Sequence, residues 1–421
     1  MPRVGFALDP TGQGIWSVRA AYGIFYDPFS NGANLAIQAP VSSVPWGQFF
    51  QISGTNVPFV NPYGGNPLPP KDTFLTPTTA VVLDNAARPP YAHDWNLSIQ
   101  RSFRNNYLLE VRYVGTKGTH LPRNVDANPA VYGPGATASN ADRRRIYADC
   151  PAATGPCRLS TVAKLMYGTN STYEGAQISF SHRYAVGFSF NVSYWFSKTL
   201  DYLSSATLAG ASSQTLAGEN DLAQNPFDLA AEHGPSLFDA KNRFVASGSW
   251  KLPFARHSTG LTGVLLRGWQ LNSIVSANSG TPFTVYDSAN VALQPTNPPI
   301  TGYFASRPDL IGPANDGPHE LNEWMSRSAF RRLNPVTEAG QFGNAGRNIM
   351  RGPGLVNIDV SAMKNFRLTE GVTLQFRAES FNVANHPNFW NPVADINSAN
   401  FGRILQASPP RLMQFALKIL F

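Results

Sequence analysis

The sequence predicts an all-β protein, an antiparallel transmembrane β-barrel of which about eleven strands are visible. Three observations lead to this fold class: apolar residues at every second position, connections that alternate between short and long, and an unusual composition. Charged residues make up 14% and aromatic residues 12% of the 421 residues, whereas soluble domains average about 25% charged residues. Such a composition, with 35 Gly and 34 Pro, disfavours a soluble helical enzyme.

The period of two is the first observation, since successive side chains of a strand point to opposite faces. In "HDWNLSIQRSF", Trp95, Leu97 and Ile99 share one face, and Asn96 and Ser98 share the other. The same pattern recurs along the chain. The expected strands comprise residues 3–9, 15–27, 91–103, 107–117, 174–183, 188–198, 243–252, 268–287, 355–366, 372–384 and 411–421.

The lengths of the connections are the second observation. Every odd-numbered connection is short and every even-numbered one is long. Outer-membrane barrels have short periplasmic turns and long extracellular loops, so the alternation indicates a barrel that crosses a membrane. The short connections are 10–14, 104–106, 184–187, 253–267 and 367–371, and the long ones are 28–90, 118–172, 199–242, 288–354 and 385–410.

A soluble antiparallel sheet is the alternative, because alternation alone also fits a sheet with one face on a soluble core. In residues 372–384, Gln375, Arg377 and Glu379 share one face, which suits either a lumen or solvent. The loop asymmetry therefore decides in favour of the barrel. No uninterrupted apolar run of about 18 residues occurs, so no membrane-spanning helix is expected.

The chain ends on "MQFALKILF", in which Met413, Phe415, Leu417, Ile419 and Phe421 alternate with other residues. In lipid every backbone N–H and C=O must be paired, and closure of a barrel removes the sheet edges. We therefore expect the last strand to pair with the first. The ending also resembles the sorting signal of outer-membrane proteins, which the barrel-assembly machinery reads, with Phe415, Leu417, Ile419 and Phe421 as its apolar positions.

The two cysteines, Cys150 and Cys157, lie in "CPAATGPC". A small loop disulfide is the preferred interpretation and implies an oxidising compartment; two free thiols are the alternative. If the cysteines are oxidised, their Cα atoms should lie about 4.4–6.8 Å apart. Two cysteines alone cannot form the usual four-ligand zinc site.

Motifs with catalytic or metal-binding spacing are incomplete in this sequence. "HELNE", His319–Glu323, departs from the zinc-protease pattern H-E-x-x-H at its last position. The net charge is +7, and its densest run, "DRRRIY", is interpreted as a solvated loop instead of a nucleic-acid patch. We therefore expect no enzyme activity, no catalytic residues, no metal, no cofactor and no nucleic-acid partner. The ligand-binding residues are not identifiable from the sequence.

Longer phrases carry a family resemblance. "PRVGFALDPTGQGIWSVRAAYGIFYD", "DWNLSIQR", "EVRYVGTKGTHL", "FDAKNRFVASGSWKLPF", "AESFNVANHPNF" and "RLMQFALKILF" resemble, in order, the C-terminal barrel of TonB-dependent receptors. The most similar branch is the Oar-like one, which bears a carboxypeptidase-regulatory domain. The resemblance implies a barrel of about 22 strands, plugged by an N-terminal domain and energised from the inner membrane through a TonB box.

The sequence shows about half of those strands and no plug domain, TonB box or signal peptide, so residues 1–421 are expected to be the C-terminal part of such a barrel. An odd strand count also cannot close the usual even-numbered barrel. The expected location is the outer membrane of a Gram-negative-type bacterium, with membrane lipid and the barrel-assembly machinery as partners. The inner-membrane energising complex would be reached only through the missing N-terminal part. The predicted function is a receptor or transporter for a bulky nutrient, and the alternative is a surface-anchoring or adhesion barrel.

Overall fold

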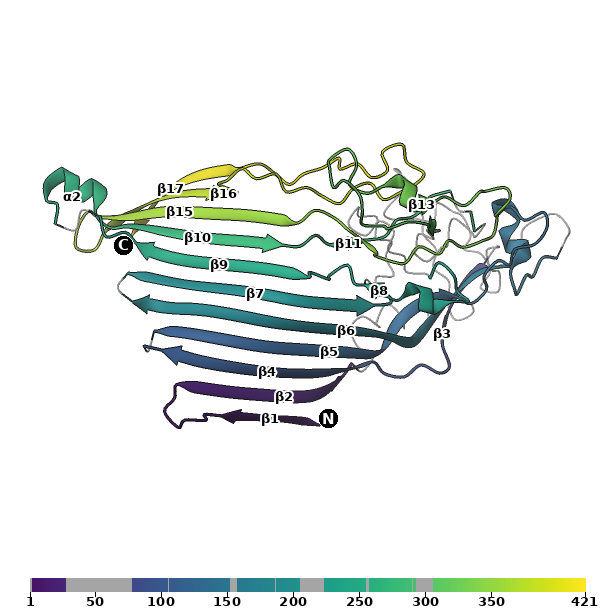
Figure 1. Ribbon diagram of the computed structural model, residues 1–421, viewed down its shortest axis with the longest axis horizontal. Coiled ribbons are helices and arrows are strands. Elements are labelled where there is room, and N and C mark those ends of the chain that lie inside the picture. The colour runs from purple at the N-terminus through teal and green to yellow at the C-terminus, as the bar shows by residue number, and fades with distance from the viewer. Residues whose placement is uncertain are drawn as a thin grey trace, which may run out of the picture.

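A computed structural model describes residues 2–27, 78–104, 106–151, 157–185, 187–204, 223–254, 257–289, 291–292 and 306–421. Eleven strands form one curved sheet in which neighbours along the chain are neighbours in space, and all of these pairs are antiparallel (Figure 1). The strands are β1 (Arg3–Leu8), β2 (Trp16–Tyr26), β4 (Tyr91–Phe103), β5 (Tyr107–Asp126), β6 (Leu159–Ala185), β7 (Phe188–Asp201), β9 (Asn242–Lys251), β10 (Trp269–Asn278), β15 (Leu355–Arg367), β16 (Thr373–Phe381) and β17 (Leu412–Leu420).

Shorter elements lie at the two ends of this sheet. The 3-10 helices are η1 (Ala138–Arg144), η3 (Leu229–Glu232) and η4 (Arg327–Ala329), and the one α-helix described is α2 (Gly260–Leu266). Within the described residues, no helix has the length and apolar character needed to span a membrane. The short strands are β3 (Thr78–Leu83), β8 (Gly234–Pro235), β11 (Pro282–Phe283), β12 (Asp309–Leu310), β13 (Phe330–Arg331) and β14 (Met350–Arg351).

The expected separation of turns and loops is present. Figure 1 shows the β4–β5, β6–β7 and β9–β10 connections at one end of the sheet, where α2 also lies. The segments that carry β3, β8, β11 and β13 lie at the opposite end. The two ends are called the turn end and the loop end below.

Several strand boundaries differ from the expected ones. β5 ends at Asp126, beyond its expected end at residue 117. β6 begins at Leu159, well before its expected start at residue 174. β3 lies inside the expected 28–90 loop and pairs with β6 in parallel. At the loop end the strands extend beyond the membrane and still form hydrogen bonds with neighbouring strands. The alternation of apolar residues and the turn residues in the sequence do not reveal these extensions.

The expected strand 268–287 is too long, because β10 ends at Asn278. "SGTP" follows, and Pro282 has no N–H to give to the ladder. A Cβ added to Gly280 would lie 1.7 Å from the carbonyl oxygen of Gly352. The two backbones therefore approach too closely for any side chain, and the chain bends away into β11, which pairs with β14.

The expectation that the last strand pairs with the first is wrong for this sheet. Among the described residues, β1 pairs only with β2, and β17 pairs only with β16. In an antiparallel series of eleven strands the first and the last run in the same direction. Their direct contact would be a parallel pair, so an even total is needed for antiparallel closure.

A compact apolar core lies outside the sheet, at the loop end. It combines segments that follow β10 with the segment that follows β16, and Val285, Met325, Met350 and Ile396 are at most 1% exposed. These long connections are therefore packed against one another. The full cluster comprises Phe283, Val285, Met325, Ala329, Phe330, Ala345, Met350, Ala394, Ile396 and Phe401.

Candidate functional site

One face of the sheet is apolar across consecutive strands. Residues directly opposite in an antiparallel ladder share a face, so the register identifies the rows. One such row crosses β7, β9, β10, β15, β16 and β17 without a polar side chain. It comprises Phe188, Trp250, Leu271, Ala362, Ala378 and Phe415.

The row beside it, on the opposite face, is entirely polar. It crosses the same six strands and comprises Ser189, Ser249, Asn272, Ser361, Glu379 and Gln414. Neighbouring side chains on this face bond to one another: Gln270 Nε2 donates to Ser249 Oγ over 2.8 Å, and Arg377 Nε donates to Gln375 Oε1 over 2.7 Å. A lipid face and a lumen face fit this division.

Aromatic side chains gather on the apolar face near the turn end. The Tyr107 and His182 ring centroids are 4.3 Å apart, and the Trp269 ring meets Phe376 edge-on at 6.0 Å. The Arg101 guanidinium lies 4.8 Å from the Trp16 ring centroid. Aromatic rings with basic side chains among them are typical of the level where lipid headgroups begin.

Helix α2 extends this face at the turn end. Lys364 is on the apolar face, opposite Trp269 and Phe376. Its ammonium is buried and donates to the carbonyl oxygens of Leu265 and Arg267 over 2.8 and 2.7 Å. The bonds hold the C-terminal end of α2 against the sheet and leave Leu261, which is 80% exposed, facing outward.

The residues of the predicted assembly signal lie on the apolar face. Phe415, Leu417 and Ile419 oppose Ala378, Phe376 and Leu374, and all three are more than half exposed. Phe421, which follows the last ladder residue, is 97% exposed. Lys418 opposes Gln375 and therefore belongs to the polar face.

A cluster of buried charges holds the loop end together, centred on Glu232 of η3. Its carboxylate forms ion pairs with Arg307 at 3.0 Å and with Arg123 of β5 at 3.5 Å. All three side chains are at most 3% exposed. Gln224 donates its backbone N–H to Glu232 Oε1 over 3.0 Å, so both carboxylate oxygens have partners.

Two further arginines continue this network. Arg347 forms an ion pair with Asp201, at the end of β7, and its Nε donates to the Glu232 carbonyl over 2.8 Å. Arg351 of β14 forms an ion pair with Asp239. The network therefore fastens the segments between β10 and β15 onto the ends of β5 and β7.

The electrostatics of Glu232 follow from these contacts. Burial by itself would raise the pKa of the Glu232 carboxyl, but the Arg307 and Arg123 guanidiniums outweigh it and hold the pKa below its ordinary value of 4.5. Hydrogen bonds from Arg307 and Gln224 act in the same direction. Glu232 is therefore ionised at neutral pH, and the cluster is a charged one.

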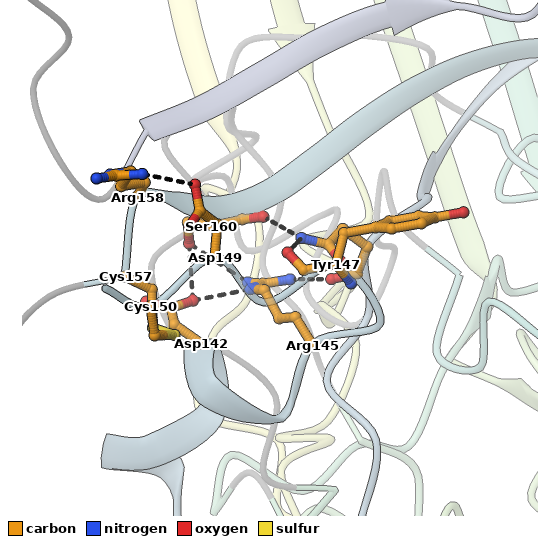
Figure 2. The surroundings of a disulfide bond; sticks show 9 residues. Asp142, Arg145, Tyr147, Asp149, Cys150, Cys157, Arg158 and Ser160 are labelled. Atoms are coloured by element: carbon orange, nitrogen blue, oxygen red, sulfur yellow. Dashed lines mark hydrogen bonds and ion pairs between the residues drawn. A yellow bond between two sulfur atoms is a disulfide. The ribbon is translucent and has the colours of Figure 1, made fainter. Parts of the chain in front are cut away.

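Cys150 and Cys157 are joined in a disulfide, as Figure 2 shows. Their Cα atoms are 4.0 Å apart, which is shorter than the expected range. Beside them Arg145 donates to Asp142 over 2.8 Å and to the Asp126 carboxylate over 3.0 Å. Part of "DRRRIY" is thus a buried ion pair, whereas the whole run was expected to be solvated.

The zinc-like phrase forms a turn. Glu320 and Glu323 exchange backbone hydrogen bonds of 3.1 and 3.2 Å, and the His319 ring lies against Trp324 with the centroids 5.0 Å apart. Among the described residues, no group of three or more His, Cys, Asp or Glu side chains could hold a metal ion.

The buried charge network was missed by sequence reasoning. Its members come from segments far apart in the chain: Glu232 is separated from Arg307 by 75 residues and from Arg123 by 109. Spacing therefore carries no signal. The one available hint is compositional, since arginines recur in the long connections of a chain with few charges.

A membrane-spanning antiparallel sheet, apolar on one face and polar on the other with its long connections at one end, is the class of structure that this geometry defines. The chain belongs to the outer membrane beta barrel domain family, which it matches over residues 1–414. Its location is therefore the outer membrane, and the soluble alternative is set aside.

Several solved structures resemble the fold. The outer membrane transporter YddB from Escherichia coli has a TM-score of 0.49 at 9% sequence identity, and the alignment covers 99% of this chain and 39% of the YddB chain. The ferripyoverdine receptor of Pseudomonas aeruginosa scores 0.42 at 10% identity, with 100% and 32% covered. The siderophore receptor PiuA from Acinetobacter baumannii scores 0.43 at 9%, with 99% and 35% covered. The chain thus spans about a third of these structures' length. No curated protein matches the chain.

Proposed function

We propose that the chain is the barrel portion of an outer-membrane TonB-dependent receptor or transporter for a bulky nutrient, and that it carries out no catalytic step. The observation that carries this proposal is the polar face of the sheet together with the loop assembly at one end of it. A wall of serine, asparagine and glutamine side chains suits solutes in a water-filled lumen. A loop assembly fastened by buried ion pairs provides a fixed entrance.

In this proposal residues 1–421 are the C-terminal part of a larger barrel of the Oar-like branch. Within the described residues the outer edges of β1 and β17 have no strand partner, which supports this proposal because further antiparallel strands can add there. A plug domain and a TonB box in the N-terminal part of the protein would connect it to the inner-membrane energising complex.

Assembly is the second part of the proposal. Phe415, Leu417, Ile419 and Phe421 would be read by the barrel-assembly machinery as the C-terminal signal. Their position on an exposed, apolar edge strand supports this, since among the described residues β17 pairs on one side only and its other edge presents a row of backbone donors and acceptors.

An adhesion or surface-anchoring barrel is the second candidate. The observation that favours it is the same loop assembly, because a packed apolar core and buried ion pairs also suit a rigid surface that binds a partner. In that case the lumen would transport nothing.

A deletion of the encoding gene tests the choice between the two. The transport proposal expects lost growth on one or more large nutrients at limiting concentration, restored by the full-length gene and not by a gene lacking the TonB box. Normal growth on every nutrient, combined with lost attachment to surfaces, would overturn transport and favour adhesion.

A further inference from the structure

A cavity of about 470 Å³ lies at the loop end of the sheet. It is bounded by the end of β10, the start of β15 and the segment between β16 and β17. Ligand sites for small molecules commonly occupy roughly 300–1,000 Å³, so this cavity has room for one. The side chains with the largest part in its chemistry are Asn278, Tyr286, Phe389, Trp390, Asn391 and Gln406.

The cavity opens on the lumen side. Asn278 and Leu355 both line it and are direct partners in the β10–β15 ladder. Asn278 lies six residues after Asn272 in β10. Because six is an even number, its side chain is on the same face as Asn272, which belongs to the polar row. The cavity is therefore at the entrance of the lumen, where an incoming solute would arrive.

Among the described residues that line the cavity there is no Asp, Glu, Lys, Arg or His side chain. This contrasts with the rest of the loop end, where buried ion pairs predominate. Burial, with the Asp395 carboxylate nearby, raises the pKa of Tyr286, so its hydroxyl is neutral at physiological pH. An anionic ligand would lose its hydration here without gaining a counter-charge.

The lining combines aromatic surface with unused hydrogen-bonding capacity. Trp390 is 45% exposed, so part of its indole ring can contact a ligand. Asn278 Oδ1 is buried and has no hydrogen-bond partner among the described residues. A buried acceptor without a donor is unfavourable, and a rotation of the Asn278 side chain toward the cavity would let a hydroxyl or amide group of a ligand satisfy it.

We propose that this cavity binds a neutral saccharide. The apolar C–H face of a sugar ring would stack on Trp390, and its hydroxyls would donate to Asn278 Oδ1 and bond with the amides of Asn391 and Gln406. The inference rests on the proposed function, whose transported nutrient it assigns to the class of neutral glycans.

The test is calorimetric titration of the full-length protein in detergent micelles with neutral tetrasaccharides of glucose, xylose and mannose. At least one should bind. Trp390→Ala should weaken that binding about tenfold or more, as loss of a central aromatic contact typically does. Trp390→Phe, which keeps a ring, and Trp195→Ala, which removes a lumen-facing indole outside the cavity, should bind nearly as the parent does. Asn278→Leu should also weaken binding, which covers the case in which Trp390→Ala fails to fold.

Three results would overturn the inference. No tetrasaccharide binds at millimolar concentration; or binding is unchanged in both Trp390→Ala and Asn278→Leu; or an anionic ferric chelate binds and loses affinity in these variants. The third result would reject the saccharide while leaving transport intact. Failure of transport itself is read separately, from the growth of the gene deletion.

Discussion

Glu232→Gln is the substitution that tests the buried charge network most sharply. The side chain keeps its size and most of its shape, so packing is little changed. What is lost is the negative charge shared by two guanidiniums, those of Arg307 at 3.0 Å and Arg123 at 3.5 Å. One carboxylate oxygen is also replaced by an amide group that can only donate.

The size of the expected loss of stability in Glu232→Gln follows from the burial of Arg123 and Arg307. Arg123 and Arg307 are 0% and 3% exposed, so neither can recover its hydration after the substitution. Removal of one partner from a buried ion pair costs about 3–5 kcal/mol, because an uncompensated charge stays buried. We expect a loss of this size in the free energy that keeps the loop end closed.

Hydrogen–deuterium exchange of the detergent-folded protein measures this local free energy. Backbone amides of residues 306–311 and 343–351 should exchange much faster in Glu232→Gln, whereas those of β7 and β9 should not change. Asp149→Asn is the control, since its ion pair with Arg158 is more than half exposed on both sides and should contribute at most about 1 kcal/mol. Equal, small effects of the two substitutions would refute the reasoning.

The same residue predicts a pH dependence. The folded pKa of Glu232 lies below its ordinary value of 4.5, so the unfolded loop end binds more protons near that pH than the folded one. The contribution to stability is therefore complete above pH 4.5 and is lost as the pH falls through the lower, folded value. The difference in exchange between the parent and Glu232→Gln should shrink on acidification; a difference independent of pH would contradict the charge argument.

Three further predictions concern the sheet, the disulfide and the ending. Val192→Arg, on the apolar face in the middle of β7, should destabilise the membrane-inserted barrel by about 2–4 kcal/mol, and Asn191→Arg, on the polar face, should cost much less; equal costs in urea unfolding would mean that the faces are misassigned. Thiol labelling of exported protein should modify Cys150 and Cys157 only after reduction; labelling without reduction excludes the disulfide. Deletion of Phe421 should sharply reduce outer-membrane insertion in cells and leave detergent-folded stability within about 1.5–3 kcal/mol of the parent; normal insertion would remove its role as an assembly signal.

Period-two patterning was sufficient to find the membrane-crossing part of the fold. The apolar and polar rows expected in residues 372–384 are the rows that the β15–β16–β17 register shows, with Phe376 and Gln375 on opposite faces. Lipid on one side and water on the other impose this alternation residue by residue, so the signal is local. Outside the membrane both faces of a strand can meet water, so the alternation is no longer required there. The limits of β5, β6 and β10 were missed for that reason.

The loop end was beyond sequence reasoning on physical grounds. Its core joins Phe283 to Phe401, and its charges join Asp201 to Arg347 across 146 residues. Such contacts depend on where each loop leaves the sheet in three dimensions. A short stretch of sequence contains no information about that position. The cavity beside Trp390 was unseen for the same reason, since its lining comes from two separate connections, the one between β10 and β15 and the one between β16 and β17.

The orientation of the sheet in the outer membrane is the most direct test of the barrel topology. Single cysteines placed in the full-length protein report it: Val336→Cys, at an 82% exposed position of the loop end, and Glu370→Cys, in the β15–β16 turn. We expect a membrane-impermeant maleimide to label Val336→Cys in intact cells, and to label Glu370→Cys only after the outer membrane is permeabilised. Labelling of Glu370→Cys from outside intact cells, or equal labelling of both positions, would contradict the arrangement of short periplasmic turns and long extracellular loops.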